Sequence, residues 1–258
     1  MSNTYTNGKG IIRFDSAVTS VGNNAFYNVR RLDSINLPTT VASIGGPAFY
    51  LNPLNAIRIP DSVTSISDNA FSSTNIHNFY IPSSVTSITS LFCTHGRTQK
   101  IVVDPNNTKY DSRGNCNAVI ETASNTLVCG CNNTFIPDSV TTIRSYAFAF
   151  GINKPTIIIP NSVRRIEGYV FYHIIELTTI VIPNSVTFIG LYTFNGCTGL
   201  TSVTCLATTP PELGSNVFGD TNNCPIYVPA VSVDAYKSAS GWSNYASRIQ
   251  PIYVYSFN

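Results

Sequence analysis

Cysteines are the side chains of this sequence best suited to metal or redox chemistry, and the chain has seven of them: Cys93, Cys116, Cys129, Cys131, Cys197, Cys205 and Cys224. An odd number cannot pair completely within one chain, and the spacings do not fit a zinc site. A soft-metal or redox site could use Cys116, Cys129 and Cys131, but a C-x-C pair without a nearby histidine makes a poor tetrahedral ligand set. We therefore expect mostly buried thiols, and we predict no metal and no cofactor.

Catalytic groups are sparse. The three histidines, His77, His95 and His173, lie far apart, and the chain has only 13 acidic residues. Cys93 and His95 share a loop, but side chains two positions apart in a short turn seldom face each other, and no third group would orient the imidazole. Residues 104–115 fail the EF-hand template, and the sequence lacks the common nucleophile, phosphate-loop and zinc-protease motifs. We predict that the protein is not an enzyme, with a hydrolase as the remote alternative.

Charge and hydropathy exclude two further classes of partner. Only 11% of the residues are charged and the formal net charge is +2, so we expect no nucleic-acid binding. No apolar run approaches the roughly 18 residues of a membrane span, and the first residues do not resemble a secretory signal. We expect no membrane insertion by this sequence. If the protein is exported, its signal and anchor lie outside the sequence; if Met1 is the natural start, it leaves its cell by another route or stays inside.

The chain is built from a repeated unit, because variants of residues 59–71, IPDSVTSISDNAF, recur along it. Any functional site must therefore be positioned by these repeats. The apolar residue that precedes the proline or its equivalent marks each copy: Phe14, Leu37, Ile59, Ile81, Val103, Ile136, Ile159, Ile182, Cys205 and Val228. The steps are 22 or 23 residues, except for one step of 33 between Val103 and Ile136. Such a period predicts one solenoid domain over residues 1–258 with about ten rungs and a shared core.

Each repeat can be assigned to two short strands and a turn. In the copy at residues 177–194, Ile180 and Ile182 alternate with outward residues, and Pro183 ends the strand because it lacks an N–H. A second extended segment follows at residues 186–189, and a compact helical turn then places Phe194 in the core. Equivalent phenylalanines include Phe71, Phe148 and Phe171, so we predict a buried ladder of rings.

Two segments depart from the repeat. The long step contains an insertion at residues 104–134, in which apolar runs at 117–122 and 126–131 predict a β-hairpin in place of the convex part of one repeat. Residues 207–258 read as a C-terminal cap, with a short helix that Ser232 would N-cap and with Tyr236, Trp242 and Tyr245 covering the core. Removal of this cap is expected to promote association through the exposed end.

The repeats resemble the BspA-like, Treponema pallidum-type leucine-rich repeats, whose unit reads LxxIxIPxSVTSIGxxAFxxC. The resemblance implies a right-handed, β-rich leucine-rich-repeat solenoid with short helical turns on its convex side, and the insertion and cap are similar to those of Bacteroides members. It also implies an extracellular or cell-surface adhesion module that binds a host or bacterial surface protein or glycan, without catalytic residues. A structural spacer or virion-surface domain is the alternative. The sequence does not predict the oligomeric state.

The best candidate binding surface is a strip on the outer face of the main sheet. The residues that precede five successive repeat markers should point outward on neighbouring strands about 4.8 Å apart: Tyr80, Val102, Phe135, Ile158 and Val181. A second outward column should provide a polar rim: Asn78, Lys100, Asn133, Thr156 and Thr179. A contiguous exposed apolar patch is typical of an interaction site. The plainer alternative is that β-branched and aromatic residues simply favour strands, or that another segment covers them.

Overall fold

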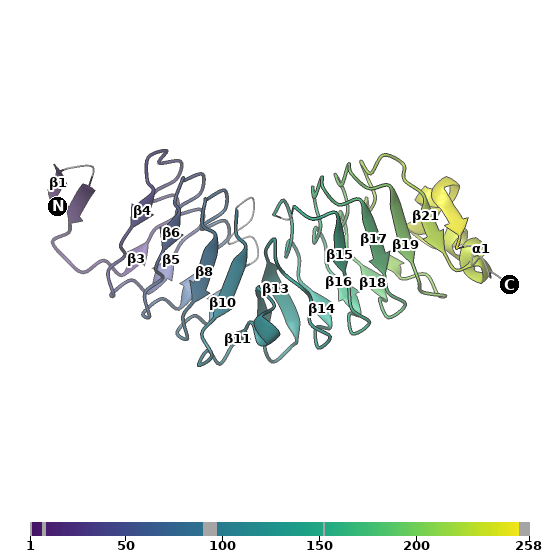
Figure 1. The fold of residues 1–258 in the computed structure, drawn as a ribbon, viewed down its shortest axis with the longest axis horizontal. Coiled ribbons are helices and arrows are strands. Elements are labelled where there is room, and N and C mark those ends of the chain that lie inside the picture. The colour runs from purple at the N-terminus through teal and green to yellow at the C-terminus, as the bar shows by residue number, and fades with distance from the viewer. Residues whose placement is uncertain (1, 7–8, 90–96, 152, 253–258) are drawn as a thin grey trace.

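The computed structural model describes residues 2–6, 9–89, 97–151 and 153–252, which wind into a β-solenoid of about ten turns (Figure 1). The main sheet is formed by the first strand of each repeat and consists of three groups of parallel strands. These are β4 (Ser34–Ile35) with β6 (Ala56–Ile57); β8 (Asn78–Ile81) with β10 (Lys100–Val103); and β15 (Thr156–Ile158), β17 (Thr179–Ile182), β19 (Ser202–Cys205), β21 (Ile226–Val228) and β22 (Ile249–Pro251).

A second sheet is formed by the SVTSI segments. Its repeat strands are β3 (Ser20–Val21), β5 (Ser43–Ile44), β7 (Ser65–Ile66), β9 (Ser87–Ile88), β14 (Thr142–Ile143), β16 (Arg165–Ile166), β18 (Phe188–Ile189) and β20 (Glu212–Leu213). The chain turns between the two sheets directly after each proline. In one copy the amide of Val163 donates to the carbonyl of Pro160, at an N–O distance of 3.1 Å. This turn brings the valine into the core, where Val163 is fully buried.

The phenylalanine turns make a third set of contacts between rungs. In the rung of Phe171, Tyr169 and His173 adopt left-handed backbone conformations with φ of 60° and 54°. The amides of these three residues donate to carbonyls of the following rung at 2.9 Å. Equivalent bonds in other described rungs run in the same direction, with each N–H directed toward the C-terminal neighbour.

The predicted phenylalanine ladder is confirmed, and in the described part of the chain its rings form two stacks. Phe71, Phe148, Phe171 and Phe194 are all at least 98% buried. One stack holds Phe26, Phe49 and Phe71, with ring centroids 5.3 and 5.4 Å apart. The other runs from Phe148 through Phe171 and Phe194 to Phe218, at 5.6, 5.2 and 5.6 Å.

The insertion separates the stacks, and its predicted hairpin is confirmed. It contains β11 (Tyr110–Asp111), η1 (Arg113–Asn115), β12 (Ala118–Glu121) and β13 (Thr126–Gly130), with β12 and β13 antiparallel and β13 paired to β14. Gly130 occupies the place of a ladder phenylalanine. Its amide donates to the carbonyl of Ala147 at 2.9 Å, and a Cβ atom on Gly130 would lie only 2.0 Å from the ring of Phe148.

Both faces of the hairpin are buried, so it separates two hydrophobic cores. Ile120 and Leu127 pack into the C-terminal core, whereas Val119 and Val128 pack into the N-terminal core. Continuous apolar strands of this kind are typical of sheets that are covered on both sides. The hairpin therefore acts as an internal partition of the solenoid.

The C-terminal cap consists of η2 (Ala230–Ser232), α1 (Val233–Ser238), η3 (Trp242–Arg248) and β22. Tyr236 and Trp242 are fully buried, and the Trp242 Nε1–H donates to the Pro211 carbonyl at 2.7 Å. The helix begins after Ser232 as predicted, but the capping role is wrong. The Ser232 hydroxyl donates to the Thr208 carbonyl at 2.7 Å and makes no bond to the helix amides.

The N-terminal end differs from the prediction. Strands β1 (Ser2–Thr6) and β2 (Lys9–Arg13) pair with each other in a hairpin that stands apart from the stacked rungs (Figure 1). The expectation that Phe14 is a buried repeat marker is wrong, because its side chain is 50% exposed beside this hairpin. Leu37 is half-buried, and the markers from Ile59 onward are buried.

Candidate binding surface

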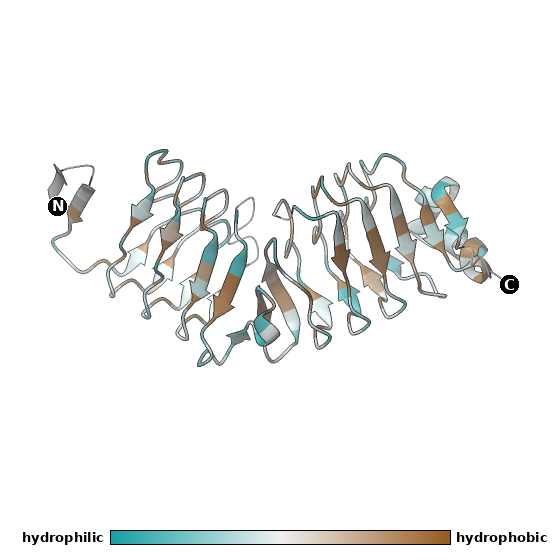
Figure 2. Cartoon of the chain, in the orientation of Figure 1, coloured by the Kyte–Doolittle hydropathy of each residue, from teal (hydrophilic) through white to brown (hydrophobic). Residues whose placement is uncertain are grey.

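The structure places four members of the predicted strip, Tyr80, Val102, Ile158 and Val181, on strands of the main sheet. Four members of the strip are exposed: Tyr80 by 49%, Phe135 by 51%, Ile158 by 84% and Val181 by 50%. Val102 is half-buried. Tyr80 pairs in register with Val102, and Ile158 pairs with Val181. Hydrophobic colouring along β15 and β17 is visible in Figure 2.

The predicted continuity of the strip is wrong at Phe135. This residue belongs to no strand, and β10 and β15 are in separate sheets. The insertion is the cause, because the amide of Phe135 donates to the Cys116 carbonyl at 3.2 Å. The Phe135 ring lies over η1, where its Cζ would be 3.6 Å from a Cβ atom on Gly114. The strip is therefore two apolar pairs of residues with an aromatic ring between them.

A pocket opens where the sheet is interrupted. It has a volume of about 740 Å³ and lies between residues 134–138 and residues 154–161. Phe135 and Ile158 of the strip line it, and it reaches Phe148 of the core and Ile157, which packs against that core. The Lys154 Nζ donates to the Thr134 carbonyl at 3.1 Å across this gap.

The predicted rim is polar and solvent-accessible. Asn78, Lys100 and Asn133 are exposed, and Asn78 pairs in register with Lys100. The Tyr80 hydroxyl donates to the Asp104 carboxylate, so an acid lies beside the N-terminal part of the strip. This hydrogen bond raises the pKa of Tyr80 and lowers the pKa of Asp104. The tyrosine thus carries an oriented hydroxyl at the edge of an apolar surface.

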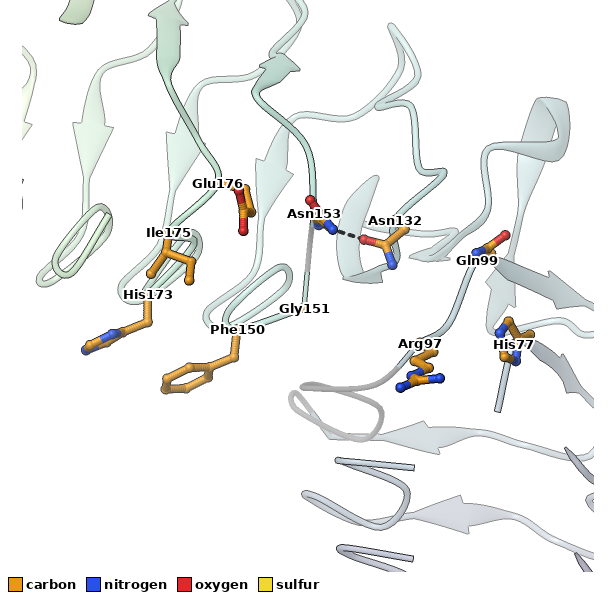
Figure 3. A pocket seen from close by; sticks show the side chains of 10 residues that line it. All are labelled: His77, Arg97, Gln99, Asn132, Phe150, Gly151, Asn153, His173, Ile175 and Glu176. Carbon is orange, nitrogen blue, oxygen red and sulfur yellow. Dashed lines mark hydrogen bonds between the residues drawn. The ribbon is translucent and has the colours of Figure 1, made fainter. Parts of the chain in front are cut away.

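A second cleft, of about 510 Å³, lies where the two halves of the solenoid meet (Figure 3). His77 and Arg97 line it from the N-terminal half, and His173 lines it from the C-terminal half (Figure 3). The amide of Asn153 donates to the Asn132 Oδ1 at 2.7 Å across its floor. The His173 ring stacks on Phe150, with centroids 5.6 Å apart, and points away from His77 (Figure 3). In the interactions of the described residues, neither imidazole is paired with a nucleophile. The cleft therefore offers polar contacts without a recognisable catalytic arrangement.

The six cysteines that the structure describes are buried. Burial raises the pKa of the Cys116 thiol to about 11 and that of Cys197 to about 12, so both are protonated near neutral pH. Cys93 and His95 lie outside the described residues. The described residues contain no cluster of three or more histidine, cysteine or acidic side chains that could bind a metal ion. None of the described helices is long and apolar enough to cross a bilayer.

Sequence reasoning missed three residues in or beside the pocket. Gly114 makes room for the Phe135 ring, Lys154 spans the gap, and Asp138 lines the far end of the pocket. The only available signal was the 33-residue step, which places an irregularity immediately before Phe135. It locates the interruption but does not show which strand edge is left open.

Comparisons with known proteins agree with this architecture. The family described as "BspA type Leucine rich repeat region" matches residues 5–118 and 125–238, with six copies. A leucine-rich repeat protein from Eubacterium ventriosum has a similar structure, with 24% identity and a TM-score of 0.67 over 86% of this chain and 69% of the other. A leucine-rich cell surface protein from Faecalibacterium prausnitzii has 22% identity and a TM-score of 0.68 over 91% of this chain and 63% of the other.

The pneumococcal vaccine antigen PcpA is also similar, with 20% identity and a TM-score of 0.59 over 89% of this chain and 68% of that protein. The chain thus spans about two thirds of the length of these solved proteins. No curated protein sequence matches it. At these identities the structural likeness establishes the fold alone.

Proposed function

Because this chain belongs to the family of BspA-type leucine-rich repeat proteins, we propose that it is a non-catalytic recognition module at a cell surface. The main sheet binds a protein or glycan on a host or bacterial surface. One observation carries this proposal: Tyr80, Phe135, Ile158 and Val181 expose about half or more of their side chains on one face, next to an open apolar pocket. Exposed apolar patches with polar rims tend to mark interaction sites.

The similar proteins support the location. The Faecalibacterium protein is described as a cell surface protein, and PcpA is described as a vaccine antigen. A solenoid suits this role because its rungs form one extended surface on a rigid stack. Few charged residues are needed for such binding, in agreement with a composition that is 11% charged.

The test is a double substitution, Tyr80→Ser with Phe135→Ser, in the full chain. Binding is measured by surface plasmon resonance against mucins, matrix proteins and a glycan array, and the melting temperature is recorded for each variant. Val231→Ser is the matched control, because Val231 is 91% exposed on the cap and far from the strip in sequence. The proposal expects the double variant to melt normally and to lose binding, while the control retains it. Equal binding by all three proteins would refute it.

A further inference from the structure

Strand β15 has an open edge that faces the pocket. Among the strands that the structure describes, it is the first of its five-stranded sheet and pairs with β17 alone. The Pro155 carbonyl accepts the amide of Thr179 of β17 at 3.3 Å. Because successive residues of a strand direct their backbone groups to opposite sides, the N–H and C=O groups of Thr156 and Ile158 face away from β17. In the described part of the chain, these four groups have no hydrogen-bond partner.

The facing edge of the sheet is closed instead. The amide of Val103 in β10 donates to the Ser112 hydroxyl at 3.1 Å, and the amide of Phe135 donates to Cys116 at 3.2 Å. The insertion thus covers the N-terminal half and leaves β15 uncovered. The Lys154 side chain reaches across through its bond to Thr134, and the Asn132 side chain accepts the amide of Asn153 nearby.

An unpaired edge beside an apolar pocket is the arrangement that accepts an extended peptide as an added strand. We infer that the pocket binds an extended segment of a partner protein, which pairs with Thr156 and Ile158 and extends the main sheet by one strand. This inference rests on the proposed function and names the chemistry of its partner. An apolar side chain of the segment enters the pocket toward Ile157 and Phe148.

The charges at the two ends of the pocket define the partner further. Lys154 lies just before β15, and Asp138 lies beyond residues 134–136, so a cation and an anion stand near opposite ends of the slot. Asp138 is exposed. A complementary segment has an acidic residue near Lys154 and a basic residue near Asp138, with an apolar residue between them. Such complementarity also fixes the direction of the peptide.

The experiment begins with selection of linear dodecapeptides from a displayed random library on the immobilised full chain. A selected peptide is then synthesised with an N-methyl group at each backbone position in turn, and its affinity is measured by fluorescence polarisation. Strand pairing predicts that methylation at alternate positions weakens binding and that the intervening positions tolerate it, because only every second N–H faces β15. This readout requires no variant of the protein.

Two substitutions in the protein complete the test. Ile158→Pro removes the outward N–H, which takes no part in the ladder to β17, whereas Ile158→Thr removes a similar apolar side chain and keeps the N–H. Ile158→Pro should bind the peptide about tenfold more weakly than Ile158→Thr, as expected for one lost hydrogen bond. Asp138→Lys should abolish the preference for a basic residue at that end of the peptide.

Several outcomes would overturn the inference. They are failure to select a peptide, loss of affinity without the alternating pattern, and equal affinity of the Ile158→Pro and Ile158→Thr variants. A glycan that binds both Ile158 variants equally but not the Tyr80→Ser, Phe135→Ser double variant would overturn it and leave the proposed function standing. Failure of the proposed function is distinct, because the double variant would then bind every probe as the parent does.

Discussion

Replacement of Phe171 by alanine tests whether the ring ladder carries the stability of the C-terminal core. The Phe171 ring is fully buried between Phe148 and Phe194, with centroids 5.6 and 5.2 Å away. Truncation of such a side chain costs about 3 to 5 kcal/mol, which includes the cavity that it leaves. The upper part of this range is expected because both ring faces lose a stacked neighbour, each pair adding about 0.5 to 1.5 kcal/mol.

The assay is thermal and urea unfolding followed by circular dichroism. Each kcal/mol corresponds to roughly 2 to 4 °C for chains of this size, so Phe171→Ala should lower the melting temperature by roughly 6 to 20 °C. Phe26→Ala is the matched control, because Phe26 is half-buried at the end of its stack and has one stacked ring neighbour among the described residues, Phe49, at 5.3 Å. Phe26→Ala should lower the free energy of unfolding by less than half as much as Phe171→Ala. The reasoning would be refuted if Phe171→Ala melted within about 2 °C of the parent, or if Phe171→Ala and Phe26→Ala lowered the melting temperature equally.

Gly130→Ala should destabilise the protein by about 1 to 3 kcal/mol in urea unfolding, because the new Cβ would lie 2.0 Å from the Phe148 ring; unchanged stability would show that the ring can move aside. Ellman's reagent at pH 8 should react rapidly with at most one thiol in the folded protein and with several more in guanidinium, because six of the seven cysteines are buried; rapid reaction of two or more in the folded protein would contradict this. Burial raises the pKa of Asp111, but hydrogen bonds from Arg113 and Thr122 outweigh it, and the net pKa is lowered. The carboxylate therefore stabilises the fold above an unfolded pKa of about 3.9, and this stability is lost as the pH falls. Asp111→Asn should flatten the decline between about pH 4 and pH 2 in urea titrations, and an unchanged decline would count against this role.

The repeat made most of the fold predictable. The spacing of the markers and of phenylalanines such as Phe171 reports buried positions directly, because each rung must bury the same side chains against its neighbours. The insertion was located by length, and its continuous apolar runs at 118–120 and 127–129 carried a signal for burial on both faces. The expected burial of Phe14 was wrong because β2, which precedes it, pairs with β1 and not with a strand of the main sheet.

The candidate site was less predictable for a physical reason. Period-2 alternation correctly placed Tyr80, Ile158 and Val181 on the outside, since it depends only on local strand geometry. Whether two strands are neighbours depends on the intervening chain, and here the insertion removes Phe135 from the ladder. The pocket and the open edge of β15 are consequences of that long-range contact, so a local pattern could not reveal them.

The uniform direction of the hydrogen bonds between phenylalanine turns gives the solenoid an electrical polarity. Each peptide carries a dipole of about 3.5 D, and here the dipoles add along the stack as they do in an α-helix. The direction of the summed dipole is opposite to that of an α-helix, because the N-terminal end presents carbonyl oxygens instead of N–H groups. The carbonyls of Ala25 and Tyr27 in the first rung receive no N–H from the residues that the structure describes. At the other end the Tyr245 hydroxyl accepts the amide of Phe218. Two copies that met first rung to first rung would oppose negative ends, so this column of peptides resists symmetric end-to-end pairing.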